Sequence, residues 1–98
     1  MKKNKNSLNA LFDKAESAFK RCIKKDENVF LQDEIDFPVS SIKTQRKSVA
    51  SKSDKDNPKR FTIEVEILLL SDQNKVIGSY TYVEDQNEVQ IDDYLVFD

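Results

Sequence analysis

Residues Phe61-Thr-Ile-Glu-Val-Glu-Ile-Leu-Leu-Leu70 decide the fold, because every second residue from Phe61 to Leu69 is apolar. Strict alternation at a period of two predicts a β-strand with one buried face. A single strand cannot bury its apolar side alone, so other segments must supply neighbouring strands and a covering layer.

Two further strands are predicted after this stretch. Residues 76–84 are rich in valine, isoleucine, tyrosine and threonine, which favour strands, and residues 88–97 form the closing strand. The intervening Asp85-Gln-Asn-Glu88 is typical of a turn, where Asn or Asp can take the left-handed conformation usually given to glycine. We therefore expect residues 61–98 to form a three-stranded antiparallel meander.

Two strands are also predicted before it, at residues 29–39 and 41–50. Pro38 has no backbone N–H to donate, so the first of them should lie at a sheet edge or bend there. Residues 51–59 are polar and have loop composition, which indicates a mobile loop at the tip of a long hairpin.

An amphipathic helix is predicted over residues 7–25. Its apolar residues recur at spacings of three and four: Leu8, Leu11, Phe12, Ala15, Phe19, Cys22 and Ile23. Lysines, arginine and glutamate fill the positions between them, so one stripe can cover the apolar face of the sheet. The predicted fold is α+β, with residues 1–98 as one domain and the helix packed on an antiparallel sheet of four to five strands.

Alternation also assigns side chains to the two faces of the sheet. The inward face is predicted to carry Phe61, Ile63, Val65, Ile67, Leu69, Val76, Tyr80, Tyr82, Val89, Ile91, Leu95 and Phe97. A two-residue turn at 86–87 would place Tyr82 opposite Ile91. The outward face is then predicted to carry Thr62, Glu64, Glu66, Ser79, Thr81, Gln90, Asp92 and Tyr94. A slip of one residue would exchange the two faces.

Charge is strongly segregated along the chain although the net charge is only −2. Residues 1–25 carry a net +6, residues 26–37 a net −5 and residues 38–60 a net +5. Residues 61–98 carry nine acids and one base, a net −8. The nearly neutral total therefore hides two basic blocks and a markedly acidic C-terminal third.

The residue types that carry most enzyme chemistry are scarce. There is no histidine, and the one cysteine, Cys22, falls on the apolar stripe of the helix, where a thiol packs as a small hydrophobe. The one glycine, Gly78, lies inside a predicted strand, so there is no glycine-rich phosphate loop. The spacing of the C-terminal carboxylates does not match a calcium loop. We expect no catalytic activity, no cofactor and no metal.

The expected cellular compartment rests on the signal-peptide, membrane-span and disulfide patterns of the sequence. Met1-Lys-Lys-Asn-Lys5 resembles the start of a signal peptide, but charged residues interrupt the apolar run that should follow. No apolar stretch approaches the roughly 18 residues of a membrane span. A single cysteine cannot form an internal disulfide. We expect a cytoplasmic protein that does not bind membranes and is a monomer or a weak dimer.

The outward face of the sheet is the candidate partner-binding site. Its predicted residues, with the acidic rim, are Glu64, Glu66, Glu84, Asp85, Glu88, Asp92 and Tyr94. Like charges on adjacent strands repel each other, and a cationic partner would relieve that repulsion. Tyr94 would add a rigid anchor with a polar tip.

The stretch Gly78-Ser-Tyr-Thr-Tyr-Val-Glu-Asp-Gln-Asn-Glu-Val-Gln-Ile-Asp-Asp-Tyr-Leu-Val-Phe-Asp98 is a tyrosine-rich hairpin that ends in paired acids. In this it resembles the small immunity proteins of bacterial toxin–immunity systems, which are compact, non-catalytic and acidic where they cover a nuclease. The order of a helix followed by a meander is also similar to cystatin-type inhibitors. The Gln-Val-Val-Ala-Gly-like loop of that family is absent, so its inhibitory residues are not carried over.

The sequence therefore leads to one functional hypothesis and to alternatives. The hypothesis is a binding protein that occludes the active site of a cognate bacterial toxin, of nuclease type. One alternative is a nucleic-acid-associated protein that uses the basic residues of segment 43–60. Its bases are not interleaved with stacking aromatics, so nucleic acid is the weaker candidate. A secretion chaperone or a phage-encoded inhibitor would share the chemistry of an acidic binding face.

Overall fold

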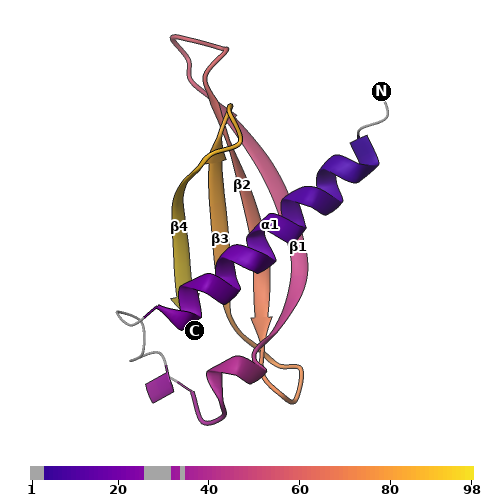
Figure 1. Cartoon of the computed structure of the whole chain (residues 1–98), viewed down its shortest axis with the longest axis vertical. Coiled ribbons are helices and arrows are strands. Elements are labelled where there is room, and N and C mark those ends of the chain that lie inside the picture. The colour runs from indigo at the N-terminus through magenta and orange to yellow at the C-terminus, as the bar shows by residue number, and fades with distance from the viewer. Residues whose placement is uncertain (1–3, 26–31, 34) are drawn as a thin grey trace.

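Helix α1 (Asn4–Lys24) crosses one face of a four-stranded antiparallel sheet (Figure 1). The computed structural model describes residues 4–25, 32–33 and 35–98. After α1 come η2 (Val39–Ser41), β1 (Lys43–Ser53), β2 (Phe61–Leu70), β3 (Val76–Asp85) and β4 (Gln90–Phe97). The strands lie in the order β1-β2-β3-β4, so each strand pairs with its neighbour in sequence. The predicted α+β class and the N-terminal helix are confirmed.

The core lies between α1 and the middle of the sheet. From the helix come Ala15, Ala18, Phe19 and Cys22, and from the sheet come Val65, Ile67, Leu69, Tyr80 and Tyr82. The two alanines let the helix approach the strands closely, while the Phe19 ring packs 5.6 Å from the Tyr80 ring at a tilt of 59°. Such tilted aromatic pairs contribute about 0.5–1.5 kcal/mol beyond the area they bury.

The predicted pairing of β3 with β4 is wrong by two residues. Tyr82 lies opposite Asp93 rather than Ile91. Two features cause the shift. Glu88 has a φ of 64°, so the turn has three residues between Asp85 and Val89. A bulge near the start of β4 then adds one unpaired residue.

This shift explains which predicted core residues are exposed. Leu95 and Phe97 keep the inward face, since a shift of two residues does not change sides. Val89 and Ile91, at the turn and the bulge, are 55% and 53% exposed. Gln90 pairs with the buried Glu84, so it does not lie on the outward face. Val76, at the first position of β3, is 51% exposed for a different reason, because the β2–β3 register shifts between Leu69 and Leu70 and pairs Val76 with the outward Leu70.

The predicted strand at 29–39 falls partly outside the described residues, and its described part contains no strand. Pro38 precedes the short η2 turn instead. The Gln32 side chain donates to the Phe37 carbonyl and accepts from the Val39 N–H, both at 2.8 Å. One side chain thus satisfies backbone groups that a strand would otherwise pair.

Strand β1 runs further than predicted, so Ser51 to Ser53 are strand rather than loop. The hairpin tip at residues 54–60 projects beyond the rest of the sheet (Figure 1). Its backbone is tied by Asp54 N–H to the Arg60 carbonyl at 2.9 Å and by Arg60 N–H to the Asn57 carbonyl at 2.8 Å. The expected hairpin tip is present in a shorter form.

Candidate functional site

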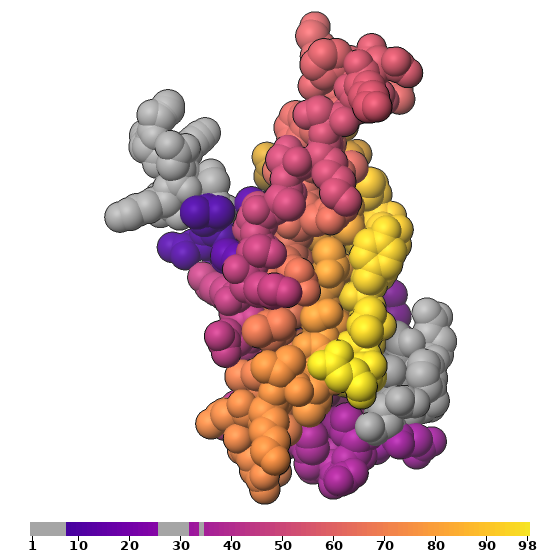
Figure 2. Space-filling model, turned by 180° about the vertical axis from the view of Figure 1, so that it is seen from behind, coloured from indigo at the N-terminus to yellow at the C-terminus, as the bar shows by residue number. Residues whose placement is uncertain are grey.

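The face of the sheet opposite α1 has no covering element among the described residues, as Figure 2 shows. Besides Thr62 and Leu70 at the two ends of β2, register and alternation place nine side chains of β2, β3 and β4 on this open face. They are Glu64, Glu66, Leu68, Ser79, Thr81, Val83, Asp92, Tyr94 and Val96. We call these nine residues the open face.

The open face is ordered in rows that cross the strands. Glu64, Val83 and Asp92 form one row. Glu66, Thr81 and Tyr94 form the next. The predicted set Glu64, Glu66, Asp92 and Tyr94 is therefore brought together on one surface. Val83, 5% exposed, is buried in the middle of the first row.

Asp92 and Tyr94 are neighbours on the exposed strand β4. The Tyr94 hydroxyl donates to Asp92 Oδ2 at 3.0 Å, and the Asp93 N–H donates to Oδ1 at 2.9 Å. The hydrogen bond to Asp92 raises the pKa of Tyr94, and the charge of Asp92 acts in the same direction. Within the described part of the chain, no lysine or arginine forms an ion pair with Asp92. Its charge is available to a partner.

The two glutamates of β2 are already compensated. Lys52 Nζ lies 3.2 Å from Glu64, and Lys47 Nζ lies 3.3 Å from Glu66. Both lysines come from β1, which borders β2. Lys47 reaches the open face because the β1 register shifts between Arg46 and Ser48. The repulsion expected from the sequence is thus relieved within the molecule on this side of the sheet.

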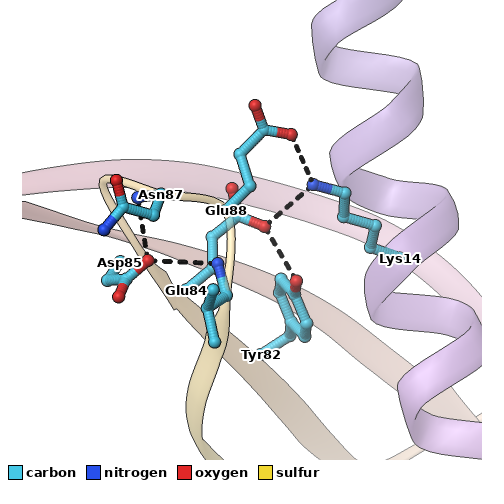
Figure 3. Close-up of polar contacts among 7 residues, drawn as sticks. Lys14, Tyr82, Glu84, Asp85, Asn87 and Glu88 are labelled. Carbon is cyan, nitrogen blue, oxygen red and sulfur yellow. Dashed lines mark hydrogen bonds and ion pairs between the residues drawn. The ribbon is translucent and has the colours of Figure 1, made fainter.

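Glu84 is not on the acidic rim where the sequence placed it. Its side chain is 2% exposed and lies on the helix side of the sheet, opposite Ile63. Lys14 Nζ donates to Oε1 at 3.1 Å, and the Tyr82 hydroxyl donates to the same oxygen at 2.7 Å (Figure 3). Tyr80, Tyr82 and Glu84 are alternate residues of β3, so all three side chains point to the helix side, and Glu84 cannot join the acidic rim.

Asp85 and Glu88 belong to the β3–β4 turn. Asp85 Oδ1 accepts the N–H of Asn87 at 2.8 Å and that of Val89 at 3.1 Å, which fixes the turn (Figure 3). The Glu88 side chain is 76% exposed and reaches back to Lys14 at 3.2 Å. Both acids therefore have structural contacts, and Glu88 lies towards the helix rather than beside Tyr94.

The basic segment 43–60 is also largely engaged. The Arg46 guanidinium bonds Asp13 at 2.9 Å and Glu16 at 3.5 Å, and it lies 5.3 Å from the centre of the Phe12 ring. Lys43 Nζ donates to Asn74 at 3.1 Å. With Lys47 and Lys52 bound to glutamates, these bases hold the domain together and offer fewer charges to a phosphate backbone.

Three features of this surface were missed from the sequence. The burial of Val83 and the ion pairs of Lys47 and Lys52 depend on pairing between strands. The one signal for the burial of Val83 is that this residue is apolar, whereas Glu64 and Asp92, which flank it in the row, are acids predicted to face outward. The bulge at Lys47 leaves no recognisable mark in a run of polar residues.

The described residues contain no group of three or more His, Cys, Asp or Glu side chains that could hold a metal ion. No helix in the described ranges is long and apolar enough to cross a membrane.

Comparison with protein-family models, curated proteins and solved structures found no match to this chain.

Proposed function

We propose that this chain is a non-catalytic binding protein that neutralises a basic protein partner, with the open face as its docking surface. The observation that carries the proposal is the exposed pair of Asp92 and Tyr94. Tyr94 is 52% exposed, and its partner carboxylate has no cation beside it in the described residues. An amphipathic ring next to an uncompensated charge is the chemistry of an interface anchor.

The partner is expected to be strongly cationic. No lysine or arginine occurs between residues 76 and 98, so β4 and its turn present one sign of charge. Such a surface steers a cationic partner at high on-rate and rejects anionic ones. A nuclease fits this description, because its cleft must hold phosphates. We therefore favour a cytoplasmic immunity protein that occludes the active site of a cognate bacterial toxin.

Nucleic acid is the weaker candidate. The bases of β1 are bound to carboxylates of α1 and β2, and a phosphate would have to compete with those ion pairs. The hairpin tip keeps Lys55, Lys59 and Arg60, but it also carries Asp54 and Asp56. A protein partner at the opposite edge meets no such competition.

The test begins with capture of the partner by the tagged chain and identification of the captured protein. Its activity and affinity are then measured with the wild-type chain and with Asp92→Lys. We expect a basic protein, inhibition by the wild-type chain, and affinity weakened at least about tenfold by Asp92→Lys.

Asp72→Lys is the matched control, because Asp72 is exposed in the β2–β3 loop and the change in net charge is the same. It should leave affinity within about twofold of the wild type. Equal weakening by both variants would mean that only net charge matters. Capture of an acidic protein would likewise contradict the proposal.

A further inference from the structure

We infer that the free edge of β4 receives an extended basic segment of the partner as a fifth strand. The inference rests on the proposed function and specifies how that partner is held. It follows from the hydrogen-bonding groups, the side chains and the charge at this edge.

The backbone of β4 has an unused side. The Asp98 N–H donates to the Ile77 carbonyl directly opposite at 2.9 Å. Because bonded pairs alternate along an antiparallel ladder, the N–H and C=O groups of Asp93, Leu95 and Phe97 point away from β3. In the described part of the chain no strand lies beyond them. The Asp93 N–H already donates to Asp92 Oδ1 at 2.9 Å, so a strand entering here would find donors at Leu95 and Phe97 and carbonyl acceptors at all three residues.

The two edges of the sheet are protected against different partners. Strand β1 carries Lys43, Lys47 and Lys52 and has an irregular register, and both features discourage pairing with another chain. Strand β4 has no lysine, arginine or proline, and its register is regular from Asp92 to Phe97. The bulge of β4 is confined to its start, and its charges, Asp92 and Asp93, discourage an acidic strand but attract a basic one.

The side chains of β4 define what would bind. Tyr94 and Val96, 52% and 53% exposed, offer apolar surface on the open side. Asp92 and Asp93 stand at the end of β4 near the turn. A strand that alternates basic and apolar residues would place its apolar side chains against Tyr94 and Val96 on the open face, and its ammonium groups on the opposite face, on the side of Asp93.

A second copy of this chain fits less well. Pairing β4 with β4 would bring two acidic strands together, at a Coulombic cost. Pairing β4 with the basic β1 of a second copy would leave a free edge at each end, so the assembly would extend without closing. The charges of the two edges thus favour a basic strand from a different protein.

The first test uses a synthetic peptide, acetyl-Lys-Val-Lys-Val-Lys-Val-Lys-amide, and the full chain. Hydrogen exchange of the Leu95 and Phe97 amides should be fast in the free protein and slow with peptide. Two further peptides carry N-methyl groups, one on every valine and the other on every lysine. In a strand, only one of these sets faces β4, so one peptide should lose at least about tenfold in affinity and the other should not.

A matched pair of protein variants tests the same edge. Val96→Lys places a protective lysine on β4, whereas Val76→Lys makes the same change at a valine of nearly equal exposure on the interior strand β3. We expect the unmodified peptide to bind Val96→Lys at least about fivefold more weakly than Val76→Lys.

Three results would overturn the inference. Equal affinity of the two N-methylated peptides would mean attraction by charge alone. Slow exchange of both amides, of Leu95 and of Phe97, in the free monomer would mean that the edge is already covered. Slow exchange that grows with protein concentration would make a second copy the occupant. If strand pairing fails while Asp92→Lys still weakens the captured partner relative to Asp72→Lys, the proposed function stands; if neither effect appears, both are wrong.

Discussion

Lys14 is the residue on which the buried carboxylate of Glu84 depends. Its ammonium bridges Glu84 and Glu88 at 3.1 and 3.2 Å. Burial of the ammonium lowers its pKa, but the hydrogen bonds and charges of the two glutamates outweigh burial, so the pKa of Lys14 is raised above its usual value. The Tyr82 hydroxyl completes the set of donors to Glu84.

Replacing Lys14 by methionine leaves Glu84 buried with only the tyrosine as a donor. We expect Lys14→Met to lower the free energy of unfolding by about 1–2 kcal/mol in urea denaturation. This is less than the roughly 3–5 kcal/mol for a fully buried pair, because Lys14 is 35% exposed. Lys52→Met is the control, since its partner Glu64 is 29% exposed, and it should cost at most about 0.5 kcal/mol. Equal losses would contradict a special role for Lys14.

The core tyrosines make stability depend on alkaline pH. Burial, followed by a 2.7 Å hydrogen bond to a carboxylate, raises the pKa of Tyr80 and of Tyr82 above the usual 10.0. The unfolded chain therefore loses these protons first as the pH rises. The stability they give is complete below pH 10 and is lost above it, by about 1.4 kcal/mol per pH unit for each tyrosine.

A titration of tyrosinate absorbance, followed together with circular dichroism, checks this prediction. The ionisation of Tyr80 and Tyr82 should coincide with loss of the fold. Two tyrosines that ionise near pH 10 while the fold persists would contradict the buried hydrogen bonds.

At the scale of elements, the one glycine lets β4 lie against β3. Gly78 faces Phe97, and a Cβ there would collide with the Val96 carbonyl and lie 3.0 Å from the Phe97 Cα. Its φ is not positive, so the requirement is for space rather than for an unusual backbone. The free edge proposed as a docking site depends on this close pairing.

Gly78→Ala should therefore push β4 away from β3 and lower the free energy of unfolding by about 2–3 kcal/mol. Ser79→Ala, at the next position and on the open face, should stay within about 0.5 kcal/mol of the wild type. Thermal unfolding measures both variants. A Gly78→Ala protein as stable as Ser79→Ala would rule out the close approach.

Some of the helices and strands can be predicted from the sequence pattern, and others cannot. Period alone predicts α1 and β2 and places Val65, Ile67 and Tyr80 in the core, because each has a long, uninterrupted pattern. Periodicity does not predict the β3–β4 turn, because Glu88 takes a left-handed backbone conformation that is uncommon for glutamate. The turn and the bulge together decide the register, and the bulge leaves Ile91 unpaired and exposed.

The candidate site can be predicted only as far as alternation assigns its residues to one face of the sheet. Glu66 and Tyr94 were assigned to one face by alternation, which survives a shift of two residues. The burial of Glu84 was not foreseen, because it needs a lysine seventy residues away in sequence. The neutralisation of Glu66 likewise needs Lys47, which reaches it across the β1–β2 ladder.

At the scale of the whole molecule, the order of the strands turns charge segregation in sequence into polarity in space. Each strand pairs with the next, so the basic segment 43–60 forms one side of the sheet and the acidic β4 the other. Between them β2 joins the two, with its glutamates bound to lysines of β1. At β4, the carboxylate of Asp92 has no ion pair among the described residues, and no described strand pairs with the outer edge of its backbone.

The central claim is that the open face and the edge of β4 bind a basic protein. Hydrogen exchange of the full chain with its captured partner measures the location of binding most directly. The account predicts slower exchange at β4, centred on Leu95 and Phe97, with no change in the hairpin tip 54–60. Protection confined to that tip or to the outer face of α1, with β4 unchanged, would contradict it.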